Sequence, residues 1–319
     1  MKRPTVIVLL ASLALFRCSS SQEPFFKITT PEEYLNEMLD YMEANHIDRK
    51  SIDWPAFRQA VQQKGAGAET ISGADGAVLL ALELLNDQTS FLVTSQGKVL
   101  AFSTPCTDAA PPEVTVPADV GYIKIPAFGN SGVNAAVFAE KMHGDIRAQD
   151  KAGLKGWLVD LRGNTGGNMW PMVAGIGPIL GEGTAGYFID SNDVKNAFGY
   201  QDGASFYGEK PVVGVSFPYT LLSADSKVAI LVDHATTNAA EAVAIAFIGK
   251  ANARSFGPTT CGRAGGNQAF TLSDGSILYL TVSFLKDRAE TAQRGELTPD
   301  EIVTDPILVF DKAVEWINQ

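Results

Sequence analysis

Two short apolar segments, each followed by a turn and a helix-forming stretch, constrain the fold of this chain most. Gly156–Asp160 runs into the glycine-rich turn Leu161–Gly167. Val228–Val232 repeats the plan, with the turn Asp233–Asn238 and then Ala239–Ile248. Apolar strands that alternate with helices predict crossover units and a mostly parallel sheet. We therefore expect an α/β core with both turns at the carboxyl edge of the sheet, where ligands bind.

The region before this core predicts a small helical domain over residues 28–104. Thr30–Glu33 reads as a capping box with proline at the first helical position, and further helices are expected from Asp53 and over Asp75–Leu85. The following stretch to Pro117 contains four prolines and few residues that pack, so it marks the domain boundary. Residues 118–319 form the expected α/β domain.

The first residues predict export. Lys2 and Arg3 precede the apolar run Val6–Phe16, which is too short for an ordinary spanning helix and is typical of an export signal. Cys18, followed by small polar residues, resembles the cleavage site of a bacterial lipoprotein, although Arg17 stands where a small residue is usual. We expect residues 1–18 to be an export signal, a location in the periplasm or cell envelope, and membrane attachment only through a lipid on Cys18.

Charge and hydropathy exclude several classes of partner. The chain of 319 residues has a net charge of −11, so it would be repelled by nucleic-acid phosphates and anionic lipid. No later apolar run is long enough to span a membrane. The three histidines have no spacing typical of a metal site, so neither a metal nor a cofactor is expected.

The turn Arg162–Gly167 suits an anion or an oxyanion, because its glycines let backbone N–H groups approach a ligand closely. Phosphate binding is the competing interpretation of such a turn. This turn lacks the Lys-Ser/Thr ending of a nucleotide-binding loop, which disfavours that interpretation.

With these motifs in this order, the chain resembles the tail-specific, or C-terminal-processing, serine peptidases. Gly156–Met169 is close to the family's strand and oxyanion loop, Val228–Ile248 looks like its nucleophile strand and helix, and Leu297–Val303 is similar to its closing Pro-Asp motif. The resemblance implies a crotonase-like (ClpP/crotonase) mixed-sheet α/β core. It also implies a small N-terminal helical domain, in the branch without a PDZ module.

The resemblance places substituted residues at the catalytic positions. The family's serine nucleophile stands three residues before the helix glutamate, here Glu241, so Asn238 occupies that position. The histidine base of this branch corresponds to Thr89, and the lysine of the other branch to Arg263. An amide is no nucleophile, threonine does not titrate near neutral pH, and arginine stays charged. Loss of both nucleophile and base predicts a pseudoenzyme.

The frame of the site is expected to remain. The backbone amides of Gly166, Gly167 and Ala239 would form an oxyanion-like donor cluster that can bind a peptide carbonyl or a terminal carboxylate without chemistry. The expected partners are therefore peptides or protein C-terminal segments, in a groove lined by Val120–Ile125 and the Tyr187–Tyr200 region.

Two alternatives stay open. A rearranged peptidase could use Cys261 as nucleophile and His234 as base if their side chains meet. Cys261 could instead pack as a small apolar residue or form a disulfide with Cys106. The second alternative is a non-catalytic envelope scaffold, in which the pocket is vestigial and the helical domain makes the contacts.

Overall fold

The computed structural model describes residues 30–102, 106–108 and 110–319, so the expected export segment and Cys18 lie outside the described residues. None of the described helices is both long and apolar enough to cross a membrane. The helices are, in chain order, α1 (Pro31–Asn45), α2 (Trp54–Gly65), a short 3₁₀ turn η1 (Ile71–Ala74), α3 (Asp75–Leu85), α4 (Val133–Gln149), α5 (Met169–Leu180), α6 (Ala239–Ile245) and α7 (Leu308–Asn318).

A parallel sheet forms the centre of the α/β part. Its order is β14 (Glu301–Ile302), β10 (Ala253–Gly257), β9 (Lys227–Leu231), β4 (Gly156–Asp160) and β3 (Val120–Lys124), and every neighbouring pair is parallel. The expectation of crossover units is confirmed here. Strands that are apolar on both faces need cover on both sides.

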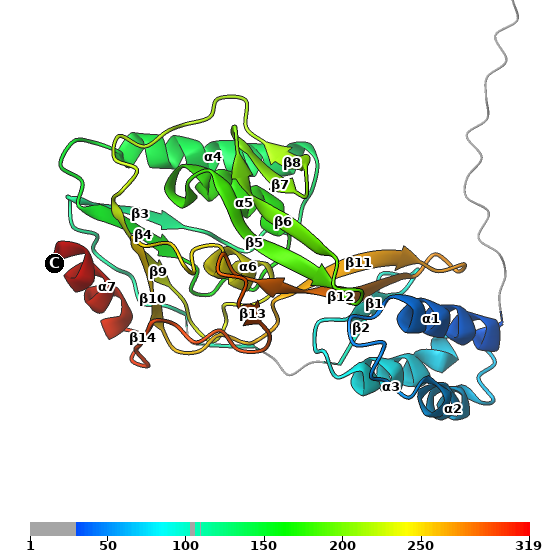
Figure 1. Cartoon of the computed structure of the whole chain (residues 1–319). Coiled ribbons are helices and arrows are strands. Elements are labelled where there is room, and N and C mark those ends of the chain that lie inside the picture. Colours follow the sequence, from blue (N-terminus) through cyan, green and yellow to red (C-terminus); the bar gives the residue numbers. More distant parts are fainter. Residues whose placement is uncertain (1–29, 103–105, 109) are drawn as a thin grey trace, which may run out of the picture.

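The two faces of this sheet contribute to different cores. Trp157 and Val159 of β4 point into the main core, which includes α5 and α6, whereas Leu158 between them packs with Phe310 and Ile317 of α7. This alternation follows from the two-residue period of a strand. In Figure 1, α7 accordingly lies against one side of the sheet while α4, α5 and α6 lie on the other.

A second, antiparallel sheet joins strands from both halves of the chain. Its main order is β2-β1-β12-β5-β6-β7-β8, and β11 and β13 also pair with β12. The resulting fold is a mixed α/β structure with two sheets. Its strands are β1 (Phe91–Val93), β2 (Val99–Ala101), β5 (Gly183–Asp190), β6 (Lys195–Gln201), β7 (Ala204–Tyr207), β8 (Lys210–Gly214), β11 (Gly265–Thr271), β12 (Ile277–Lys286) and β13 (Ala292–Gln293).

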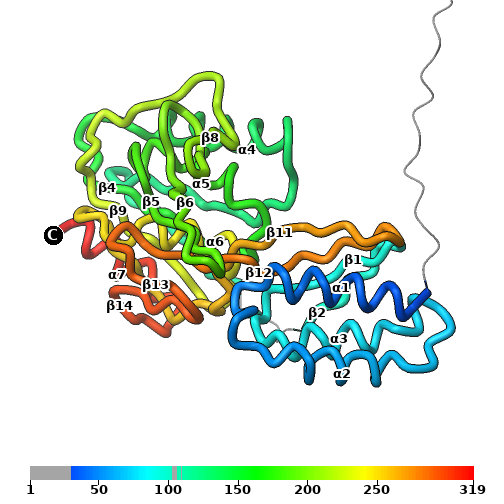
Figure 2. Tube along the Cα trace, turned by 45° about the vertical axis from the view of Figure 1, so that its right-hand side comes forward, coloured from blue at the N-terminus to red at the C-terminus, as the bar shows by residue number. Residues whose placement is uncertain are grey.

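The N-terminal helices do not close a core by themselves. Their apolar side chains, among them Tyr34 and Leu82, pack against Leu272, Leu278 and Leu280 from the β11–β12 hairpin. Figure 2 shows this hairpin extending from the α/β part alongside α1, with β1 and β2 beside it. The hydrophobic core of segment 28–104 therefore includes side chains from the distant residues 272–280.

Candidate functional site

The two strand-to-helix turns meet, as their place at the carboxyl edge of a parallel sheet requires. The Thr237 amide donates to the Asn164 carbonyl oxygen (3.1 Å). A Cβ added at Gly166 would lie 2.8 Å from the Asn238 Cβ, so the turn directly contacts the predicted nucleophile position. Gly166 and Gly167 have φ values of +92° and +113°, which favour glycine.

Asn238 forms a sharp elbow between β9 and α6. Its backbone has φ +53° and ψ −115°, a conformation outside the left-handed helical region that L-residues rarely adopt. Its half-buried side chain lines the main cavity. The elbow thus presents the amide side chain of Asn238 to the cavity.

Glu241 holds the elbow in place. Its fully buried carboxylate accepts the Asn238 N–H (2.9 Å) and, from the following loop, the N–H groups of Gly262 and Arg263 (2.7 Å each) and the Thr260 hydroxyl. Burial raises the pKa of Glu241, and the hydrogen bonds from these groups partly offset that rise. The sequence carries a signal for this contact, because asparagine followed three residues later by glutamate, here Asn238 and Glu241, is a capping-box pattern.

The donor cluster is smaller than predicted. Gly167 and Ala239 line the cavity, and within the described chain neither N–H has a hydrogen-bond acceptor. The Gly166 N–H is different, because it donates to Oδ1 of the buried Asn164 (2.9 Å). The prediction that Gly166 supplies a ligand-binding amide is therefore corrected: Gly166 shapes the turn, and two amides remain for a ligand.

The main cavity adjoins these amides and has a volume of about 900 Å³. The aromatic side chains in its wall are Phe91, Trp170, Phe188, Tyr207 and Tyr279. Phe188 belongs to the expected Tyr187–Tyr200 region, whereas the segment Val120–Ile125, which contains β3 of the parallel sheet, does not line the cavity. That part of the groove prediction is wrong.

One wall of the cavity is a strand edge. Residues Gly265–Ala269 of β11 line it, and β11 pairs with β12 along its other edge. In the part of the chain that the structure describes, no further strand pairs with β11. An unpaired edge offers backbone donors and acceptors to an extended peptide.

Thr89, at the position predicted for the base, lies just behind this wall. A Cβ at Gly265 would be 3.8 Å from its Oγ1, and the Asn267 side-chain amide donates to its carbonyl oxygen (2.9 Å). Its buried hydroxyl is 2.7 Å from the Thr281 hydroxyl and 3.1 Å from the Asp87 carbonyl oxygen. This hydroxyl is held within a polar network and has no basic partner.

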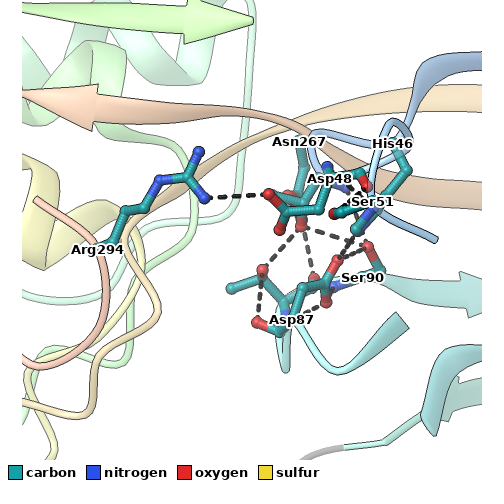
Figure 3. Close-up of polar contacts among 9 residues, drawn as sticks. His46, Asp48, Ser51, Asp87, Ser90, Asn267 and Arg294 are labelled. Carbon is teal, nitrogen blue, oxygen red and sulfur yellow. Dashed lines mark hydrogen bonds and ion pairs between the residues drawn. The ribbon is translucent and has the colours of Figure 1, made fainter. Parts of the chain in front are cut away.

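Asp87 is the centre of that network (Figure 3). Its carboxylate accepts Nε2–H of the fully buried His46 (3.0 Å), the Ser90 hydroxyl and the Thr89 amide (2.9 Å). Burial alone would raise the pKa of Asp87, but the hydrogen bonds from His46, Ser90 and the backbone lower it to about 2.

This constellation is not a catalytic triad. The His46 Nδ1 accepts the Asp48 N–H (3.2 Å), so Nε2 is the ring nitrogen that donates to Asp87. A triad requires the histidine between the serine and the acid, whereas here Asp87 lies between His46 and Ser90. The sequence offered no signal for the pairing, because His46 and Asp87 are 41 residues apart.

The two cysteines among the described residues, Cys106 and Cys261, lie next to each other. Cys106 and Cys261 form a disulfide with a Cα–Cα distance of 5.8 Å. A disulfide sulfur carries no thiolate, so the alternative of a Cys261–His234 catalytic pair is wrong for this structure. The backbone N–H of His234 donates to the Asp108 carboxylate (3.3 Å).

Among the described residues, no group of three or more His, Cys, Asp and Glu side chains lies close enough together to hold a metal ion.

Comparison with known proteins gives a consistent result. The model of peptidase family S41 matches residues 119–303. The nisin-resistance protein of Lactococcus lactis subsp. lactis is 25% identical over 91% of this chain and 87% of its own length. Among solved structures, a lipoprotein from Streptococcus agalactiae superposes with a TM-score of 0.74 at 21% identity, covering 92% of this chain and 98% of that one. The photosystem II D1 C-terminal processing protease superposes with a TM-score of 0.56 at 14% identity, covering 92% and 98%. The two structures show a shared fold.

Proposed function

Because this chain belongs to peptidase family S41, we propose that it binds peptides beside Asn238 and does not cut them by the family's serine mechanism. The observation that carries the proposal is the contrast at the elbow. The backbone strain, the Glu241 brace and the amides of Gly167 and Ala239 are present, while Asn238 and Thr89 stand at the positions that the family resemblance predicts for the nucleophile and the base. Such a site can bind a carbonyl but cannot form an acyl-enzyme.

The cavity supports an extended, partly apolar peptide as the ligand. A peptide that adds to the free edge of β11 would bring its backbone toward the Gly167 and Ala239 amides and its side chains toward Trp170, Phe188 and Tyr207. Protein C-terminal segments are included in this class, because one relative in the family is named a carboxyl-terminal-processing protease.

The proposed location is the cell envelope after export. The N-terminal sequence and two relatives, one named a nisin-resistance protein and one a lipoprotein, support this location. Lipid attachment at Cys18 is part of the proposal. Nisin is a natural first probe, because one relative is named for resistance to it.

Binding is tested by fluorescence anisotropy with nisin and with unstructured peptides that have apolar C-termini. Ala269 is exposed, lines the cavity and lies on the strand edge, so Ala269→Trp should fill the groove and weaken binding about tenfold or more. Thr271→Trp is the matched control, because Thr271 is exposed on the same strand but does not line the cavity. Binding that survives Ala269→Trp unchanged would place the ligand elsewhere.

Catalysis is tested separately by mass spectrometry of the same peptides. We expect no cleavage by the natural chain and cleavage by the Asn238→Ser, Thr89→His double variant, which restores a hydroxyl nucleophile and an imidazole base. Asn238→Ser alone is the control and should remain inactive for lack of a base. Cleavage by the natural chain would refute the non-catalytic part of the proposal, whatever the binding data show.

A further inference from the structure

A smaller polar niche opens beside the main cavity, between the C-terminal end of α1 with the loop that follows it and the turn that joins β5 to β6. Its volume is about 210 Å³, and it shares Phe188, Tyr207 and Gln268 with the wall of the main cavity. Drug-sized ligands occupy pockets of about 300–1,000 Å³. The niche is therefore the size of a subsite for one part of a ligand that fills the larger cavity.

Arg49 is the cationic residue of this niche. Its Nε donates to Ser191 Oγ and its Nη2 to Asn192 Oδ1, both at 2.7 Å, so two neutral acceptors fix the guanidinium. Over the described residues, no carboxylate lies within ion-pairing distance of Arg49. Arg294 nearby is different, because it pairs with Asp48 at 3.1 Å.

One acidic side chain, Asp190, also lines the niche. Its Oδ1 already accepts the N–H groups of Asn192 (2.8 Å) and Val194 (2.9 Å), which fix the β5–β6 turn. The negative charge of Asp190 weakens the attraction for an anion, so an anion belongs on the Arg49 side. Guanidinium groups bind carboxylates in a planar, two-bond geometry, which suits a half-buried arginine that is already oriented.

We propose that Arg49 forms a carboxylate-binding subsite at one end of the peptide groove. The carboxylate would be either the C-terminal group of the bound peptide or the side chain of an aspartate or glutamate in it. The inference rests on the proposed peptide binding and adds to it a residue that determines which peptides bind.

The test compares the affinities of four forms of one peptide for the natural full chain. They are the free C-terminal acid and the C-terminal amide, each with an internal glutamate or glutamine. If the C-terminus is the ligand, amidation should weaken binding about tenfold or more; if the side chain is the ligand, Glu→Gln should do so. The same discrimination should disappear in Arg49→Gln, be partly kept in Arg49→Lys, and persist in the control Arg294→Gln.

The outcomes separate this inference from the proposed function. A purely structural Arg49 would weaken all four peptides equally in Arg49→Gln, and that result would overturn the subsite. Equal binding of all four peptides to the natural chain, lost in Ala269→Trp, would also overturn the subsite while leaving peptide binding intact. If no peptide binds the natural chain, both the proposed function and the subsite are wrong.

Discussion

The carboxylate of Glu241 accepts the backbone N–H of Asn238 at 2.9 Å, and its other oxygen accepts the N–H of Gly262 at 2.7 Å. One buried side chain thus couples the elbow before α6 to the loop that continues to β11. The cavity wall and the elbow consequently depend on the same acceptor.

Replacing the Glu241 carboxylate should lower the stability of the folded chain. In Glu241→Gln one oxygen becomes an NH₂ group that faces amide donors, so we expect the free energy of unfolding to fall by roughly 3 kcal/mol. Peptide binding should weaken as well, because the elbow loses its brace. Denaturant unfolding measures the change, and Glu315→Gln is the control, since Glu315 pairs with Lys312 at an exposed site. A change in stability no larger than that of the control would contradict the bracing role.

The Asp87 network predicts a specific dependence of stability on pH. The pKa of Asp87 is about 2 in the folded chain and would be near its ordinary value of 3.8 when unfolded. Because the folded-state pKa is lowered, the stabilisation is present above about pH 4 and is lost as the pH falls toward 2. The shift corresponds to about 2 kcal/mol.

Asp87→Asn should therefore lower stability at neutral pH by about that amount and flatten the curve between about pH 4 and pH 2. Urea unfolding over this pH range makes the measurement, with the exposed Asp145→Asn as control. If the stability of Asp87→Asn fell between about pH 4 and pH 2 as steeply as that of the natural chain, Asp87 would not be the group responsible.

The Cys106–Cys261 disulfide should stabilise the folded chain. It links residues 155 positions apart, and closing a loop of that length in the unfolded chain corresponds to about 2–5 kcal/mol. Cys106→Ser and Cys261→Ser should each lower the unfolding midpoint by a similar amount, and adding a reductant should bring the natural chain to the same midpoint. Each variant should also expose one more titratable thiol than the natural chain; one thiol fewer than in the natural chain would mean that the bond does not form.

Asp160 and Arg162, at the start of the glycine-rich turn, form a buried pair with an Nη2–Oδ2 distance of 2.8 Å. Arg162→Met would leave the Asp160 carboxylate buried with only neutral partners such as the Tyr122 hydroxyl (2.8 Å), so we expect a loss of about 3–5 kcal/mol. Arg254→Met is the control, because its pair with Glu301 is partly exposed and should contribute less than about 1 kcal/mol. Similar losses in both variants would show that burial does not decide the cost.

Local signals were sufficient for much of this architecture. The apolar runs at Gly156 and Val228 predicted β4 and β9, and the Asp274–Gly275 turn marks the β11–β12 hairpin. The pairings of β12 with β1 and β5 were not predicted, because these strands are far away in the sequence. Pairings of that kind depend on tertiary packing and leave little local trace.

In the site, too, local sequence signals predicted some features, whereas others depend on tertiary contacts. The elbow and the glycine turn were placed by their spacing along two parallel strands. The direction of the Gly166 N–H was not predictable, because it depends on the rotamer of the buried Asn164. Arg49 was also missed, since its role comes from the β5–β6 turn, about 140 residues later.

The shared core of the N-terminal helices has a consequence for the order of folding. Leu278 and Leu280 belong to the same cluster as Tyr34 and Leu82, so this cluster is incomplete until most of the chain exists. During synthesis, domains usually fold as they emerge, N-terminal part first. This chain would instead keep its first helices loosely packed until residues 272–280 have emerged. The N-terminal helices of a ribosome-stalled fragment that ends before Leu272 would therefore remain accessible to proteases and to a translocase that transports unfolded chains. In the full-length chain this core would be complete and the helices protected.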